Sequence, residues 1–154
     1  MPHIKSSFLL FFSLFLFGLA TNSQAQEARE LGKPYEEFGE YKVFFSVFNS
    51  SFIPPDIAKA YDLVRGANRA LVNIAVLKNG NIRGGSAQVT GEFKNLIQQT
   101  RQLVFKEIKE QNAVYYLAPL RFDNEEVLHF HITVTPEGSE KSHSFRFHRK
   151  MNTD

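Results

Sequence analysis

The sequence predicts an all-β protein, a seven-stranded antiparallel sandwich of the immunoglobulin-like type with one short crossover helix. Seven apolar, β-rich runs follow one another from Tyr41 onward, at spacings of roughly 8–15 residues and with turn residues between them. A single helical pattern interrupts them, between the first run and the second. Eleven of the sixteen phenylalanines lie after residue 25, and together with the absence of cysteine they indicate an aromatic core held without disulfides. A small β-barrel is the alternative architecture.

Residues 1–25 have the pattern of a secretory signal peptide. Lys5 precedes an apolar run, and small residues surround Ala25. A basic start, an apolar core of about 7–15 residues and a small-residue cleavage site define such segments, whereas a membrane-spanning helix needs about 20 apolar residues. We expect cleavage after Ala25, with Ala20 as the alternative site. We also expect no stable membrane insertion once the signal has been removed.

The rest of the chain divides into a flexible lead-in, residues 26–39, and one β-sandwich domain, residues 40–150. Within the lead-in, an edge segment is expected near Tyr35–Phe38. The formal net charge of the whole sequence is only +2, and no basic tract occurs in it. Nucleic acid is therefore not an expected partner, and neither is an anionic membrane surface.

The stretch 41–78 predicts a strand, a short helix and a second, central strand. The first strand, Tyr41–Phe48, is apolar on both faces, so something must cover one of them. Pro55 suits the first helical position, and Gly66 predicts a left-handed helix stop. The residues expected to face the sandwich recur at helical spacing: Ile57, Ala60, Tyr61 and Val64. The second strand is Arg69–Lys78, and the later strands are expected at Gln88–Leu96, Gln102–Lys109, Val114–Phe122, Val127–Thr135 and Ser144–Arg149.

The last two strands predict a hairpin that gathers histidines on its outer face. A two-residue turn at Gly138-Ser139 pairs Phe130 with Phe147 in the core. The same register puts His129 opposite His148 and His131 opposite Arg146. Because directly opposite residues lie about 4.5–5.5 Å apart at Cβ, His129, His131 and His148 form a candidate zinc or copper site. The alternative is a solvated face on which Arg146 repels a cation.

A second candidate site is an aromatic surface. Its members cannot all belong to one core face, and they are Phe44, Phe48, Phe52 and Tyr115, with Leu117 beside them. Large apolar surface on an exported domain is typical of an interaction site. The alternative is that the lead-in and the helix cover these side chains.

Catalytic motifs do not emerge from the sequence. It has no cysteine nucleophile and no G-x-S-x-G elbow, and its serine, histidine and aspartate residues lack a catalytic spacing. The glycine-rich stretch 80–85 has no following helix or lysine to make a phosphate loop. We expect no enzyme activity and no cofactor beyond the zinc or copper considered above.

Two long runs, residues 44–77 and 114–138, carry a family resemblance. Their sequences are FFSVFNSSFIPPDIAKAYDLVRGANRALVNIAVL and VYYLAPLRFDNEEVLHFHITVTPEG. They are similar to a family of Gram-negative periplasmic proteins classed as a domain of unknown function, number four-four-two-six, and the likeness extends over essentially the whole exported chain. The resemblance implies periplasmic export and one compact domain, and it brings no catalytic residues. The expected function is a non-catalytic binding or accessory module that meets a protein partner in the periplasm through its aromatic surface. A metal-handling protein is the alternative.

Overall fold

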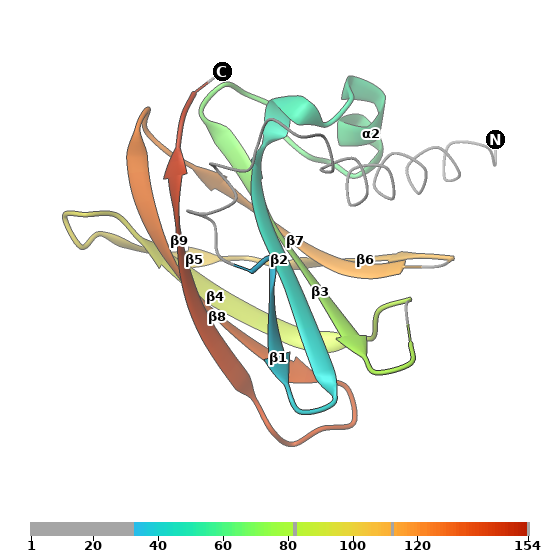
Figure 1. Ribbon diagram of the computed structural model, residues 1–154. Coiled ribbons are helices and arrows are strands. Elements are labelled where there is room, and N and C mark those ends of the chain that lie inside the picture. The colour runs from blue at the N-terminus through green and yellow to red at the C-terminus, as the bar shows by residue number, and fades with distance from the viewer. Residues whose placement is uncertain (1–32, 82, 112, 154) are drawn as a thin grey trace, which may run out of the picture.

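The structure is a computed structural model that describes residues 33–81, 83–111 and 113–153 (Figure 1). The predicted signal peptide and the lead-in as far as residue 32 lie outside the described residues. Within the described ranges, no helix has both the length and the apolar character that crossing a membrane requires.

The strands form two antiparallel sheets that pack face to face (Figure 1). The five-stranded sheet has the order β1-β2-β3-β7-β6, with bounds Tyr35–Phe38, Tyr41–Asn49, Arg69–Lys78, Ala113–Arg121 and Lys106–Glu110. The four-stranded sheet has the order β5-β4-β8-β9, with bounds Thr100–Leu103, Ala87–Lys94, Glu126–Pro136 and His143–Met151. The predicted β-sandwich is confirmed, with two separate sheets in place of a barrel. Its likeness to the immunoglobulin type in particular stays a prediction.

The described residues contain nine strands where the sequence predicts seven. The expected edge segment Tyr35–Phe38 is a strand, β1, which pairs with β2. The expected strand Gln102–Lys109 is divided into β5 and β6, which belong to different sheets. Val104 and Phe105 carry the chain across; Phe105 packs against the core, whereas Val104 is exposed. The alternation changes phase at this crossing, since Leu103 is buried in β5 and Ile108 is buried in β6.

The main core fills the space between the sheets and accounts for much of the aromatic excess. Phe45 of β2 stacks on Phe147 of β9, with ring centroids 4.5 Å apart. Phe147 in turn stacks on Phe130 of β8 at 4.7 Å. Such aromatic pairs add about 0.5–1.5 kcal/mol each beyond the burial of their area. The phenylalanines therefore hold the two sheets together where a disulfide-bonded domain would have a cross-link.

A second, smaller core lies on the outer face of the five-stranded sheet. A 3-10 turn, η1 (Ser50–Phe52), and a short helix, α2 (Pro55–Ala60), lie over this face. Its buried members come from the helical segment and from β3, β6 and β7: Ile53, Ile57, Ala58, Leu71, Ile108, Tyr115 and Leu117. Strands β3 and β7 are thus covered on both faces, which explains why β3 is apolar on both.

The helix ends six residues before the expected stop at Gly66, so that prediction is wrong. Asp62 takes the left-handed conformation, with φ 55°. Its backbone N–H donates to Lys59 O at 3.3 Å, and the N–H of Leu63 donates to Ala58 O at 2.7 Å. This is the Schellman arrangement, in which the apolar residue after the left-handed position packs back on the structure, as Leu63 does on the second core.

Gly66 does not have a positive φ, and its backbone is instead anchored to the η1 turn. The N–H of Gly66 donates to Ser50 Oγ at 3.0 Å, and the Ser50 hydroxyl donates to Gly66 O at 3.3 Å. Ser50 is buried. The expected core residue Val64 is 60% exposed, because the chain has already left the helix before it.

The predicted register of the C-terminal hairpin is confirmed. Phe130 pairs with Phe147 across β8 and β9, as the sequence pattern requires. The turn itself differs from the expected one, since the N–H of Ser139 donates to Pro136 O at 3.0 Å and Gly138, with φ 77°, is the third residue of that turn. Glycine is favoured there for the same reason as in the expected turn, its freedom to take a positive φ.

Candidate functional site

The expected aromatic surface is largely covered. Tyr115 is only 2% exposed and lies in the second core, and Phe48 is half-buried against the same core. Phe44 is half-buried, with the ring of Tyr35 from β1 at 5.3 Å. Phe52 alone among the four candidates is widely exposed, at 56%. Strand β1 and the helical segment thus cover most of this face, which is the alternative that the sequence left open.

The structure places the three candidate histidines on the outer face of the four-stranded sheet. His129 and His148 are directly opposite each other, with ring centroids 5.8 Å apart. His131 lies between Arg146 on β9 and Glu92 on β4. Within the part of the chain that the structure describes, no group of three or more histidine, aspartate or glutamate side chains is arranged to hold a metal ion. The arrangement is therefore a pair of imidazoles with a third one further along β8.

The hydroxyl group of Tyr116, on β7, makes hydrogen bonds to two neighbouring segments. The N–H of Ala87 donates to Tyr116 Oη at 2.6 Å, and the Tyr116 hydroxyl donates to Glu107 Oε2 at 2.6 Å. Burial, followed by this bond to Glu107, raises the pKa of Tyr116 to about 12. The bond from Tyr116 is also the main cause that lowers the pKa of Glu107. The contact ties the start of β4 to β6.

A similar contact holds the helical segment. The Tyr61 hydroxyl, just after α2, donates to Glu110 Oε1. Burial and this bond raise the pKa of Tyr61 to about 12, and burial is also the main cause that raises the pKa of the neighbouring Tyr115. Perturbed groups are frequent in functional sites, but they also occur in structural networks. Tyr61 fastens the end of α2 to β6, and Tyr115 of β7 is buried in the second core.

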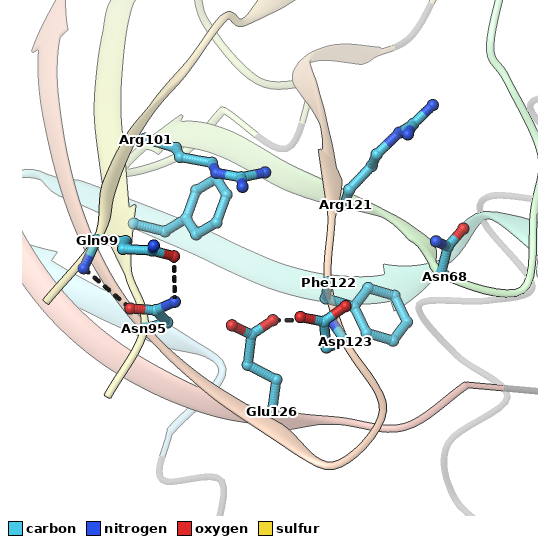
Figure 2. Close-up of a pocket in the computed structure, with 9 residues that line it drawn as sticks. Asn68, Asn95, Gln99, Arg101, Arg121, Phe122, Asp123 and Glu126 are labelled. Carbon is cyan, nitrogen blue, oxygen red and sulfur yellow. Dashed lines mark hydrogen bonds between the residues drawn. The ribbon is translucent and has the colours of Figure 1, made fainter. Parts of the chain in front are cut away.

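A pocket of about 270 Å³ opens at one end of the sandwich (Figure 2). Its lining comes from three places: the end of the β4–β5 hairpin, the turn after β7 and the segment before β3. Most of these residues are polar or charged: Asn68, Asn95, Gln99, Arg101, Arg121, Asp123 and Glu126. Phe93 and Phe122, both in the main core, contribute its apolar lining.

The tip of the β4–β5 hairpin projects from the body of the sandwich beside this pocket (Figure 1, yellow). Leu96 and Ile97 at the tip are 66% and 74% exposed. Asn95 holds the tip closed, since its Oδ1 accepts the backbone N–H of Gln99 at 2.9 Å and its Nδ2 donates to Gln99 Oε1 at 2.9 Å. Gln98 takes a positive φ of 63° to close the turn. Two apolar side chains are thus presented on a turn of fixed shape.

The sequence did not point to this end of the molecule. The expected strand Gln88–Leu96 places Leu96 within a strand, whereas β4 ends at Lys94 and Leu96 lies on the turn. The available signal is the pair Leu96-Ile97 between polar residues at a turn, since apolar side chains are uncommon there.

Solved structures with the same fold include one from a sequence relative. The crystal structure of a DUF4426 family protein from Pseudomonas aeruginosa is 33% identical, with 80% of this chain and 97% of that chain covered and a TM-score of 0.71. FetP of uropathogenic Escherichia coli, expressed in the periplasm, matches with 7% identity, 80% and 95% coverage and a TM-score of 0.55. A copper-bound variant of FetP matches equally well, with a TM-score of 0.55. At such low identity, the FetP matches show a shared fold alone.

The sequence comparisons identify the family of the chain. A search of curated proteins finds no match. The family model described as a domain of unknown function, DUF4426, matches residues 35–154, which include all the described strands. The chain therefore belongs to the DUF4426 family.

Proposed function

We propose that the protein is an exported, non-catalytic binding module that meets a protein partner in the periplasm through the tip of its β4–β5 hairpin. The observation that supports this most is the exposure of Leu96 and Ile97, at 66% and 74%, on a projecting turn. Large exposed apolar side chains that lie together typically mark interaction sites.

The rigidity of the tip favours binding. The hydrogen bonds between Asn95 and Gln99 fix the backbone that carries Leu96 and Ile97. Fixing a binding loop in advance lowers the ordering cost, which is about 0.5–1.5 kcal/mol for each side chain immobilised at an interface. A partner groove can therefore accept both side chains without first ordering the turn.

Of the aromatic surface, only Phe52 and part of Phe44 are accessible to a partner protein. Because Tyr115 and Phe48 belong to the second core, they stabilise the position of α2. A partner that used them would have to displace the helix. The hairpin tip requires no such change.

Photo-crosslinking in the periplasm distinguishes these surfaces. A photoreactive amino acid is placed at Ile97, at Phe52 and, as a matched control, at Val104, an exposed apolar residue between β5 and β6. We expect a partner adduct from position 97 and none from position 104. An adduct from position 52 with none from position 97 would contradict the hairpin tip as the binding site and would favour the aromatic surface.

Export is the second component of the proposal. It is supported by the signal pattern of residues 1–25. Mass spectrometry of the protein recovered from the periplasm should find a chain that begins at Gln26, or at Thr21 with the alternative cleavage site. An intact chain retained in the inner membrane would contradict export.

A metal-handling role is the second candidate, and the face-to-face arrangement of His129 and His148 favours it. A copper-bound variant exists of FetP, which has the same fold. If the histidines bind metal in the native state, micromolar zinc or copper should raise the melting temperature of the wild type. The double variant His129→Ala, His148→Ala should show no such rise. Equal shifts in both proteins would exclude this pair as the metal site.

A further inference from the structure

The end pocket separates opposite charges that do not pair with each other. Arg101 lies on one side of it, and Asp123 and Glu126 lie on the other, whereas the guanidinium of Arg121 points away from these groups (Figure 2). Among the residues that the structure describes, none of the ion pairs within 4.0 Å joins these groups, and no hydrogen bond engages the Arg101 side chain. Groups of opposite charge face each other across a space that a ligand can enter.

The backbone directs Arg101 into this space. Arg101 of β5 is the cross-strand partner of Phe93 of β4. Opposite residues of an antiparallel pair project from the same face of the sheet, and Phe93 belongs to the core between the sheets. Arg101 therefore projects toward the other sheet, at the end where the sandwich is open. The side chain of Arg101 is exposed at this position, so a ligand in the pocket can reach its guanidinium.

The acidic wall is held in a defined conformation. Glu126 Oε2 accepts the backbone N–H of Asp123 at 2.8 Å, and the N–H of Glu126 donates to Asp123 O at 3.1 Å. Glu125 takes a positive φ of 61° inside this turn. The carboxylate of Glu126 is thus held against the turn that carries Asp123, and both carboxylates retain acceptor positions for a cation.

From this geometry we infer that the pocket binds a small zwitterion, a free amino acid or a molecule of the same dipolar class. Its carboxylate meets the guanidinium of Arg101, which suits two-point recognition of a carboxylate. Its ammonium group meets Asp123 and Glu126, and its apolar portion lies on Phe93 and Phe122. The volume of about 270 Å³ is below the roughly 300–1,000 Å³ of pockets for drug-sized molecules, so the ligand is small.

The inference shares the end of the sandwich with the proposed function, but it rests on the charges of the pocket and not on the hairpin tip. The two can therefore fail separately. Crosslinking from position 97 in an Arg101→Gln background tests the tip alone, and titration with a small molecule tests the pocket alone.

NMR titration of the ¹⁵N-labelled protein, as recovered from its host, tests the pocket. Three probes separate the charges: L-leucine, N-acetyl-L-leucine with the carboxylate only, and L-leucinamide with the ammonium only. We expect L-leucine to shift the amides of Asn95, Gln99, Arg101 and Asp123, and to bind about tenfold or more tightly than either singly charged probe, since each charged hydrogen bond contributes about that factor.

The variants assign each charge to its side of the pocket. Arg101→Gln should lower the affinity for L-leucine about tenfold and leave the affinity for L-leucinamide unchanged. Glu126→Gln should also lower the affinity for L-leucine about tenfold, but it should leave the affinity for N-acetyl-L-leucine unchanged. Arg101→Lys keeps the charge without the planar fork and serves as a second variant should the first fail to fold. Arg146→Gln, on the outer face of the four-stranded sheet, is the control that should change nothing.

Four results would overturn the inference, and the first three concern the probes and Arg101. They are shifts by none of the probes, equal affinity for N-acetyl-L-leucine and L-leucine, and affinities that Arg101→Gln leaves unchanged. Equal affinity of L-leucinamide and L-leucine would do the same, because it would remove the role of the carboxylate.

Discussion

Phe130 on β8 and Phe147 on β9 stack in the centre of the sandwich, with ring centroids 4.7 Å apart and ring planes 11° from parallel. They are direct cross-strand partners. Their neighbours on the same strands, His129 and His148, are also partners but lie on the opposite, outer face. This one register therefore fixes both the aromatic centre of the core and the imidazole pair at the surface.

The first prediction compares the two faces of this hairpin. Phe130→Ala should lower the free energy of unfolding by about 3–5 kcal/mol, because it opens a cavity in a core where Phe130 is fully buried. The double variant His129→Ala, His148→Ala should change it by no more than about 0.5 kcal/mol. Urea denaturation of the three proteins measures both effects. A double histidine variant as unstable as Phe130→Ala would contradict the register.

The second prediction concerns the end of α2. Asp62→Val should destabilise the fold by about 1–2 kcal/mol, since a β-branched residue is poorly tolerated at a left-handed position. Gly66→Ala is the control. Its added Cβ would lie 3.2 Å from Cδ of Arg69, a side chain that can move, so the change should stay within about 0.5 kcal/mol. Thermal melts of both variants decide which residue terminates the helix. A larger loss of stability for Gly66→Ala than for Asp62→Val would indicate that the helix ends at Gly66.

The third prediction concerns pH. The hydrogen bond from Tyr116 lowers the pKa of Glu107 in the folded protein. Glu107 therefore contributes stability above its unfolded pKa, and that contribution is lost as the pH falls through the folded pKa. The stability difference between wild type and Glu107→Gln should be present at pH 7 and should shrink on acidification below about pH 4.5.

The matched control for this measurement is Glu36→Gln, a change at an exposed glutamate of β1. It should leave the pH dependence of the wild type as it is. Chemical denaturation between pH 3 and 7 gives the comparison, and a Glu107→Gln difference that is constant over this range would show that the bond to Tyr116 does not favour the charged carboxylate.

The strands and the C-terminal register could be predicted from the sequence because the side-chain period of a strand is two. Any slip by one residue between β8 and β9 would have placed Phe147 against His129 or His131. The helix end could not be found in the same way. An aspartate in the left-handed conformation, such as Asp62, looks like any exposed polar residue, whereas Gly66 is a conspicuous candidate that serves another contact.

The pocket and the covered aromatic face lay beyond the sequence for a different reason. Tyr115 is buried because α2 lies over β7. Arg101 and Asp123 line one pocket because the β4–β5 hairpin and the turn after β7 reach the same end of the sandwich. Periodicity gives the faces of a strand, but it does not say which distant segment covers a face or shares an end. The division of one predicted strand into β5 and β6 has the same kind of cause, since it depends on which sheet each half joins in the folded protein.

The proposed contact surface is tested most directly by the double variant Leu96→Ser, Ile97→Ser, with Val104→Ser as control. Both proteins should melt like the wild type, because exposed substitutions usually change stability by no more than about 0.5 kcal/mol. The measurement is the affinity for the partner captured from position 97, determined by titration with each purified variant. We predict a loss of about tenfold or more for the double variant, since at least one interface anchor is removed, and none for Val104→Ser. An unchanged affinity of the double variant would contradict the hairpin tip as the binding surface.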